Sequence, residues 1–177
     1  NVRERERRTN HDVKALEYHL KARLREIGGF DDLIERVHFG ITSEDVNNLA
    51  YALMIRDAWR DVLIPALADL IESLTNLAER TADWPMLALT HGQPASPTTV
   101  GKELGVFLTR LDGELADLID FRFSGKFSGA TGTYGALGAA HPDIDWVAFA
   151  GRFVSDLGLV PALITTQIEP HDGMAAF

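Results

Sequence analysis

The sequence predicts an all-α protein built as an elongated bundle of long helices. Apolar residues recur at spacings of three and four along most of the chain, which is the period of one helix face, and no segment alternates as a convincing strand. No glycine occurs between Ser43 and about Arg80. A single helix of that length would rise roughly 57 Å, against roughly 40 Å for the diameter of a compact globule of this size, so it needs partner helices.

The first predicted helix begins near Thr9 or Asn10, because both side chains can cap free backbone N–H groups. It ends at Gly28-Gly29, a natural stop for a helix. A second, short helix is predicted to begin at Asp31.

The longest predicted helix begins at Thr42, after a loop over residues 38–41. Asp45 lies three residues after Thr42, which resembles a capping box with Asp in place of the usual Glu or Gln. Pro65 removes one backbone hydrogen bond from the helix interior, so we expect a kink there. One face of the helix is apolar along its length: Val46, Leu49, Leu53, Leu63, Leu67, Leu70, Leu74 and Leu77.

The next long helix is predicted to begin at Ser96-Pro97, because serine suits the cap and proline suits the first helical position. Its apolar stripe comprises Val100, Leu104, Leu108, Leu111, Leu115 and Leu118. The glycine-rich residues 125–138 lack a GxGxxG or GxxxxGK[ST] pattern, which favours a turn-rich crossover over a nucleotide-binding loop. A shorter helix is predicted from about Asp145 to Leu157, with Gly158 as its stop.

Length and composition restrict the classes of protein to consider. The 177 residues suffice for one or two domains, and 46% of them are hydrophobic, as a buried core requires. The formal net charge of −9 argues against a general nucleic-acid surface. There is no cysteine, no signal-peptide pattern and no apolar run near the roughly 20 residues that span a bilayer. We expect a cytoplasmic protein that binds neither nucleic acid nor membrane.

Two further features of the sequence lie near its ends: a basic cluster, and the residues at which the chain begins and stops. Glutamates interrupt the one basic cluster, so a solvated helix face is favoured over a nucleic-acid arm. This cluster consists of Arg3, Arg5, Arg7 and Arg8. The chain begins at Asn1 rather than Met and stops at Phe177 soon after a polar motif, so we expect both ends to be cuts within a longer protein.

Three of the six histidines lie at predicted helix ends or in loops, namely His11, His38 and His91, and this placement suggests a shared cleft. Taken singly, each is more often a solvent-exposed or capping residue. Without cysteine or an HExxH pair, the histidines show no metal-site spacing, so we expect no metal.

The polar segment THGQPASPTT, residues 90–99, favours a catalytic histidine more strongly. Short polar side chains around His91 could orient its imidazole, and an oriented histidine can donate a proton to a leaving group. The alternative is a capped helix start and no more. Thr42 and Ser43 at a helix N-terminus suit a carboxylate or phosphate, although ordinary capping also explains them. Gln167 lies in the segment TTQIEPHD, which is too polar for a simple core.

Four segments together resemble the adenylosuccinate lyase family, in the fumarase and aspartase superfamily. They are NHDVKALEY (10–18), VHFGITSEDVNN (37–48), THGQPASPTT (90–99) and TTQIEPHD (165–172), in the family's order and over nearly the whole chain. Argininosuccinate lyases and fumarases would show an Asn-Asp pair after the serine of the second segment, where this chain has Glu44-Asp45. The resemblance therefore favours adenylosuccinate lyases among the relatives.

The resemblance implies a fumarase/aspartase-like bundle that is incomplete in this chain. Residues 1–40 would end an N-terminal helical domain, and residues 41–177 would form the first part of the central bundle domain. The family uses no cofactor and forms homotetramers in which each site draws segments from three subunits.

The implied reaction is a β-elimination that breaks a carbon–nitrogen bond. It releases fumarate from adenylosuccinate, giving AMP, and from the succinylo-carboxamide intermediate of purine synthesis. A base removes a proton from carbon, and an acid protonates the departing nitrogen. The resemblance assigns the acid to His91 and an assisting role, near the substrate phosphate or the acid, to His38.

The resemblance also implies a set of substrate-binding residues: His11, Asp12, Thr42, Ser43, Thr90 and Gln167. Thr42 and Ser43 would hold a succinyl carboxylate, Thr90 and Gln167 would add hydrogen bonds, and His11 and Asp12 match a segment that lines the site.

The family's base is a serine in a loop of pattern SSxMPxKxNP, which this sequence does not contain. Ser124 and Ser128 lack the residues that follow in that pattern, so neither receives the role. We therefore expect the chain alone to be inactive. Two alternatives stay open: another superfamily lyase that acts on a different succinyl substrate, and a non-catalytic helical assembly module like the crystallins related to argininosuccinate lyase.

Overall fold

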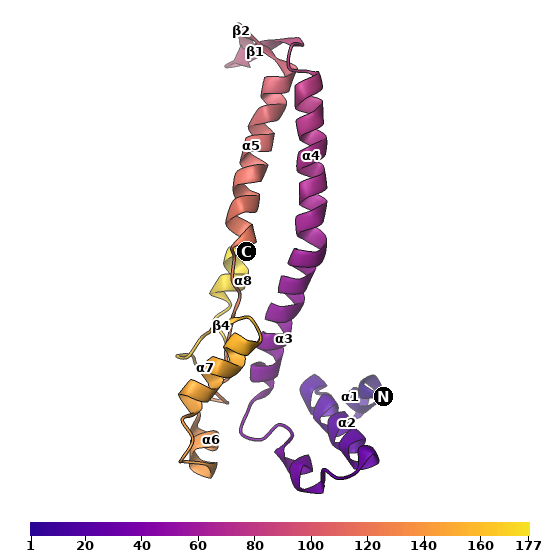
Figure 1. Cartoon of the computed structure of the whole chain (residues 1–177), viewed down its shortest axis with the longest axis vertical. Helices are drawn as coiled ribbons and strands as arrows, with labels where there is room; N and C mark the ends of the chain where they lie inside the picture. Colours follow the sequence, from indigo (N-terminus) through magenta and orange to yellow (C-terminus); the bar gives the residue numbers. More distant parts are fainter. The chain divides into compact units, whose positions relative to one another are not determined.

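The computed structural model describes all 177 residues and consists mainly of helices, which confirms the all-α prediction (Figure 1). The chain divides into two compact units. The first unit comprises Asn1–Met54 and Arg122–Ala176, and the second comprises Ile55–Phe121 together with Phe177. None of the helices is both long enough and apolar enough to cross a membrane. The predicted domain boundary at residue 40 stays a prediction.

The first unit opens with α1 (Val2–Thr9), α2 (Asp12–Ile27) and the 3-10 helix η1 (Asp31–Arg36). The predicted start near Thr9 or Asn10 is wrong, because Asn10 takes a left-handed conformation (φ 50°) and closes α1. Its backbone N–H donates to the Glu6 carbonyl at 2.8 Å. The end of α2 at Gly28 and the short helix from Asp31 agree with the prediction.

The long helical stretch consists of α3 (Ser43–Ala58), a π-helical turn η2 (Trp59–Leu63) and α4 (Ile64–Arg80). Pro65 has no N–H, and its ring would meet the carbonyl four residues earlier in a regular α-helix. The wider π turn just before it removes this conflict, with the Ile64 N–H donating to the Trp59 carbonyl. The predicted disturbance is therefore a π turn.

An antiparallel hairpin of β1 (Pro85–Thr90) and β2 (Gln93–Thr99) precedes α5 (Val100–Ile119). The predictions of no strand and of a helix start at Ser96-Pro97 are therefore wrong. A two-stranded sheet has only edge strands, which accept proline, so the proline-rich β2 still pairs. The cap of α5 is Thr99, whose Oγ1 accepts the Lys102 N–H at 3.2 Å.

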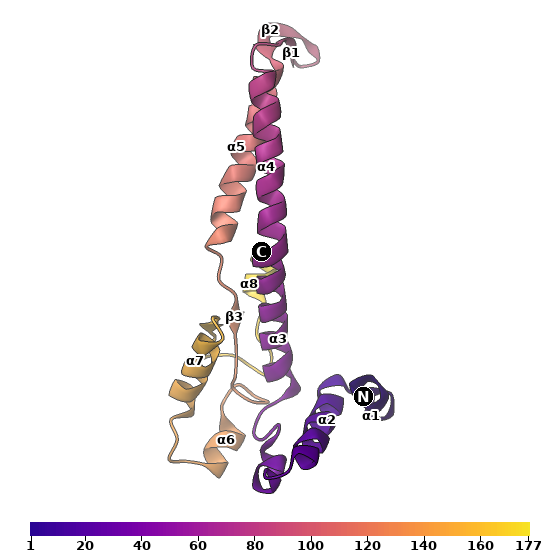
Figure 2. The ribbon, with the colours of Figure 1, turned by 45° about the vertical axis from the view of Figure 1, so that its right-hand side comes forward.

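In the second unit α4 and α5 lie side by side, and the hairpin joins their neighbouring ends (Figure 1 and Figure 2). The Trp59 indole N–H donates to the Leu118 carbonyl at 3.2 Å, and its ring packs edge-on against Phe177. No residue of α4 is buried, although Leu70 and Leu77 belong to its predicted apolar face. One chain alone leaves this face uncovered.

The rest of the first unit contains short elements around the start of α3. They are β3 (Ser124–Gly125), paired in parallel with β4 (Val160–Pro161), and the helices α6 (Gly135–Ala140), α7 (Trp146–Asp156) and α8 (Asp172–Ala176). A Cβ on Gly132 would lie 2.0 Å from the Thr165 carbonyl oxygen. This approach confirms that the glycine-rich crossover lets two backbones come close. The helix predicted from Asp145 is α7.

Candidate active site

The start of α2 lies against the start of α3. His11 is the N-cap of α2, and its Nδ1 accepts the Lys14 N–H at 3.4 Å. Its other ring nitrogen, Nε2, lies 3.4 Å from Ser43 Oγ. Asp12 Oδ1 lies 3.3 Å from His11 Nδ1 and accepts the Val13 N–H at 2.7 Å. The structure thus brings together residues of the first two sequence motifs.

His38 pairs with a carboxylate that the sequence reading missed. Its backbone has φ 69°, and its Nδ1 lies 2.9 Å from Oε2 of Glu17 on α2. Burial alone would raise the pKa of Glu17, but hydrogen bonds from Lys14, His38 and Lys21 lower it to about 2. Glu17 is therefore ionised at neutral pH. The sequence did carry a signal for this pair, because Glu17 is a charged residue at a position of α2 that faces the core.

Gln167 reaches the start of α3 from the far end of the sequence. Its Nε2 donates to Thr42 Oγ1 at 3.5 Å, next to Ser43. The backbone around Gln167 is anchored by a hydrogen bond of 2.9 Å between the hydroxyls of Thr165 and Ser128. Three of the four motif segments therefore meet at the N-terminus of α3, where free N–H groups favour an anion.

A buried ion pair ties the glycine-rich crossover to α3. Lys126 Nζ lies 3.0 Å from Asp45 Oδ1, and neither side chain is exposed. Asp45 also accepts the backbone N–H groups of Ser128 and Gly129 at 3.0 and 3.1 Å. Asn48, one turn later, accepts the Lys126 N–H at 2.8 Å and donates to its carbonyl at 3.1 Å. Asp45 therefore does more than cap: besides accepting the Thr42 N–H at 2.8 Å, it holds a distant loop.

The segment that carries Gln167 also contains a buried carboxylate, Glu169. Glu169 is 3% exposed and accepts the Ser124 hydroxyl at 2.7 Å. Its other oxygen lies 3.1 Å from His171 Nδ1, and His171 Nε2 lies 3.6 Å from Glu44 Oε1. The polar character of TTQIEPHD thus reflects anchoring by Glu169 as well as Gln167.

Thr90 and His91 belong to the second unit. His91 and Gly92 form the two-residue turn of the hairpin, with φ 51° and 72°, and Thr90 pairs with Gln93. Positive φ at both turn residues matches the right-handed twist of a hairpin. The His91 ring is exposed, and its orientation by the neighbouring polar side chains stays a prediction.

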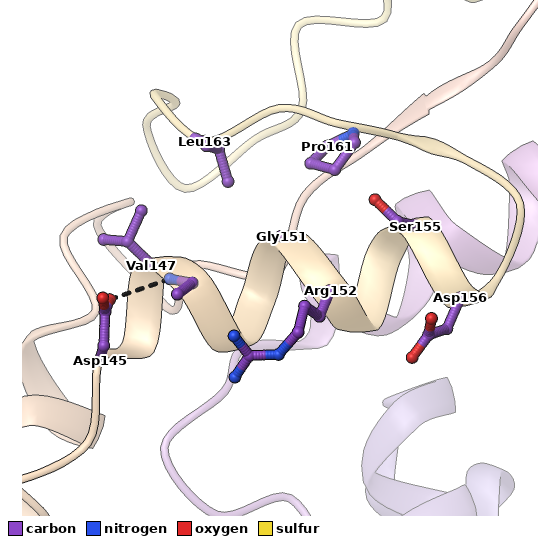
Figure 3. Close-up of a pocket in the computed structure, with 9 residues that line it drawn as sticks. Asp145, Val147, Gly151, Arg152, Ser155, Asp156, Pro161 and Leu163 are labelled. Carbon is purple, nitrogen blue, oxygen red and sulfur yellow. Dashed lines mark hydrogen bonds between the residues drawn. The ribbon is translucent and has the colours of Figure 1, made fainter.

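A hollow of about 560 Å³ runs along α7 (Figure 3). Arg152, Ser155 and Asp156 line it from the helix, and Pro161 and Leu163 lie across from them. None of the predicted site residues lines this hollow. Its size alone does not make it a candidate active site.

A family model described as a lyase matches residues 1–177. Adenylosuccinate lyase from Legionella pneumophila strain Corby is 48% identical over 174 residues, which cover 98% of this chain and 38% of that protein. Adenylosuccinate lyase from Escherichia coli strain K12 is 45% identical over 170 residues, covering 96% and 37%. The chain therefore spans less than two fifths of the length of the curated relatives it matches.

Two solved structures share the fold. A fumarate lyase from Mesorhizobium sp. BNC1 superposes with a TM-score of 0.79 at 27% identity, covering 99% of this chain and 39% of that one. A 3-carboxy-cis,cis-muconate lactonizing enzyme from Pseudomonas putida gives a TM-score of 0.72 at 26% identity, covering 90% and 35%.

Proposed function

The chain belongs to the lyase family, within the fumarate lyase superfamily, and from this premise we propose that it supplies part of an active site that releases fumarate from adenylosuccinate. The same site would act on the succinylo-carboxamide intermediate of purine synthesis. The observation that carries the proposal is the meeting of three motif segments at the start of α3, through His11, Thr42, Ser43 and Gln167.

The start of α3 is suited to hold a succinyl carboxylate. Two hydroxyls, on Thr42 and Ser43, lie at a helix N-terminus whose dipole favours negative charge. His11 and Gln167 bring further polar atoms within 3.5 Å of these hydroxyls, and Asp12 lies beside His11. A carboxylate placed there would accept hydrogen bonds from several donors at once.

His91 is the proposed general acid. In the elimination a base takes the proton from carbon, the carbon–nitrogen bond breaks, and its electron pair goes to the nitrogen, which then needs a proton. An exposed imidazole on a tight turn can reach a ligand, and Thr90 beside it can donate a hydrogen bond. His38, in the loop before α3, would assist the elimination.

The base is assigned to no residue of this chain, because the serine-loop pattern is absent from its sequence. We expect the 177 residues alone to show no turnover. In the longer protein, we propose that each site also draws on other subunits of a homotetramer. No cofactor enters this proposal.

A second candidate function is another lyase reaction of the superfamily. The muconate-lactonizing relative shares the fold at a TM-score of 0.72, so the fold alone does not select a substrate. The identities of 45% and 48% to adenylosuccinate lyases favour the first candidate.

A chimera tests the proposal. The matching 170 residues of the Escherichia coli relative are replaced by this chain, and fumarate release from adenylosuccinate and from argininosuccinate is followed by absorbance. We expect turnover with adenylosuccinate alone. A chimera with the size and helicity of the parent relative that leaves adenylosuccinate intact contradicts the proposal, and turnover of argininosuccinate instead supports the second candidate.

A further inference from the structure

Glu17 is a buried carboxylate in the first unit to which the proposed chemistry gives no role. Its side chain is 7% exposed, on the face of α2 that packs toward the loop before α3. Three cationic or protonatable groups surround it: Lys14 Nζ at 2.8 Å, Lys21 Nζ at 3.1 Å and His38 Nδ1 at 2.9 Å. Lys21 is shared with the exposed Glu35, at 2.8 Å. Two lysines are enough to neutralise Glu17, so the contact with His38 is an additional one.

The contact determines where His38 carries its proton. Because the pKa of Glu17 is lowered to about 2, its carboxylate is ionised at any pH of interest and can only accept hydrogen bonds. A separation of 2.9 Å is that of a hydrogen bond, so Nδ1 of His38 must carry the hydrogen. The neutral ring is therefore the Nδ1–H tautomer, with its lone pair on Nε2.

The other ring nitrogen is left without a partner. His38 Nε2 is buried and makes no hydrogen bond, a costly state for a polar atom. The ring borders a hollow of about 170 Å³, which Glu17 and apolar side chains of α2, of the loop before α3 and of α3 itself line. The backbone at His38 is also held at φ 69°, a region that a non-glycine residue adopts only under local constraint. A ring fixed at one nitrogen and unsatisfied at the other is prepared for an incoming group.

We propose that Glu17 is a positioning residue that fixes His38 as the Nδ1–H tautomer and so presents Nε2 as the nitrogen that meets the substrate or the proton donor. The second half of this inference rests on the proposed function, since it takes His38 to assist the elimination. In the neutral ring Nε2 accepts a hydrogen bond, and the wrong tautomer would present a hydrogen there instead.

The tautomer can be read without any substrate. In this chain labelled with ¹⁵N-histidine, long-range ¹H–¹⁵N correlations near about pH 9, well above the ordinary imidazole pKa of about 6.5, distinguish the two neutral forms. We expect His38 in the Nδ1–H form. Glu17→Met keeps the side-chain length but offers only a weakly accepting sulfur, so His38 should lose this preference. Glu17→Gln keeps an acceptor oxygen but can also donate through its amide, so it should keep the preference only in part.

Glu35→Gln is the matched control, because Glu35 binds Lys21 but does not touch His38. It should leave the His38 signals unchanged. An Nε2–H form in the wild-type chain, or an Nδ1–H form that persists in Glu17→Met, overturns the proposal. If Glu17→Met unfolds, the comparison of wild type, Glu17→Gln and Glu35→Gln still decides whether His38 is the Nδ1–H form.

The catalytic half is read in the chimera. We expect Glu17→Met to lower kcat at least roughly tenfold, with KM changed less, and Glu17→Gln to recover part of it, because a misplaced ring proton costs rate more than binding. An unchanged kcat in a folded Glu17→Met chimera contradicts this half. An inactive parent chimera instead contradicts the proposed function, and the tautomer measurement stands apart from it.

Discussion

At the residue scale, the three candidate histidines occupy special positions for three different local reasons. His11 caps the start of α2, His38 lies in a left-handed turn beside Glu17, and His91 occupies a hairpin turn. A left-handed conformation costs a non-glycine residue roughly 1 to 2 kcal/mol. Neighbouring structure must therefore hold the backbone at His38 and His91 in this conformation.

His91→Ala should lower the turnover of the chimera by at least roughly 10², the loss expected of a missing general acid. His91→Asn should cost as much, although Asn accepts the left-handed turn conformation well and keeps the hairpin. Steady-state rates of fumarate release check both variants. Near-normal turnover in His91→Asn would assign the acid elsewhere.

The pKa of Glu17 predicts a pH dependence of stability. Its value is lowered from 4.5 to about 2 in the folded chain, so ionised Glu17 contributes about 3 kcal/mol to folding above about pH 4.5. This contribution is lost as the pH falls from about 4.5 toward 2, because the unfolded chain takes up the proton first. Urea unfolding checks it: the difference in free energy of unfolding between wild type and Glu17→Gln should shrink over this range. A constant difference would contradict the assignment.

At the element scale, two sets of long-range hydrogen bonds hold distant segments against the start of α3. Asp45 and Asn48, on one face of α3, hold the glycine-rich crossover, and the crossover holds the Gln167 segment through Ser128 and Thr165. One connected set of hydrogen bonds therefore joins the helix N-terminus, the crossover and the last motif.

Lys126→Met should destabilise the chain by about 3 to 5 kcal/mol, because removal of one member of a buried ion pair leaves the other charge uncompensated. Lys102→Met is the control. Its partner Glu103 and Lys102 itself are 41% and 55% exposed, and an exposed pair contributes about 1 kcal/mol at most. Urea unfolding of both variants measures the two losses in free energy of unfolding. Equal losses would contradict a special contribution of the buried pair to stability.

At the scale of the whole molecule, the apolar face of α4 needs a cover. No residue of α4 is buried, and Leu70 and Leu77 stay 46% and 37% exposed. Leaving such side chains in water forgoes the main stabilising term of folding. Second copies of the same chain are the proposed cover, as in a homotetramer.

The chain should therefore form multimers, measured by light scattering. Leu70→Glu, on the uncovered face, should shift the population toward monomers. Asp69→Asn, the adjacent residue on the same helix, is the matched control and should not. A wild-type chain that stays monomeric at high concentration would contradict the proposal that second copies cover the apolar face of α4.

The sequence by itself determined the helical class, the stops at Gly28 and Gly158 and the family, because helix period, caps and breakers act within a few residues of one another. It predicted a kink at Pro65 but not the π turn that precedes this residue. It missed the hairpin over residues 85–99, whose strands are exposed and do not alternate.

Only the tertiary structure decided which candidates meet. The contacts of His11 with Ser43, of Thr42 with Gln167 and of His38 with Glu17 join residues 32, 125 and 21 positions apart. Asp45 and Lys126 are likewise far apart in the chain, and a buried charge is stable only beside its partner. No local pattern specifies such a pairing, because it depends on how the segments pack.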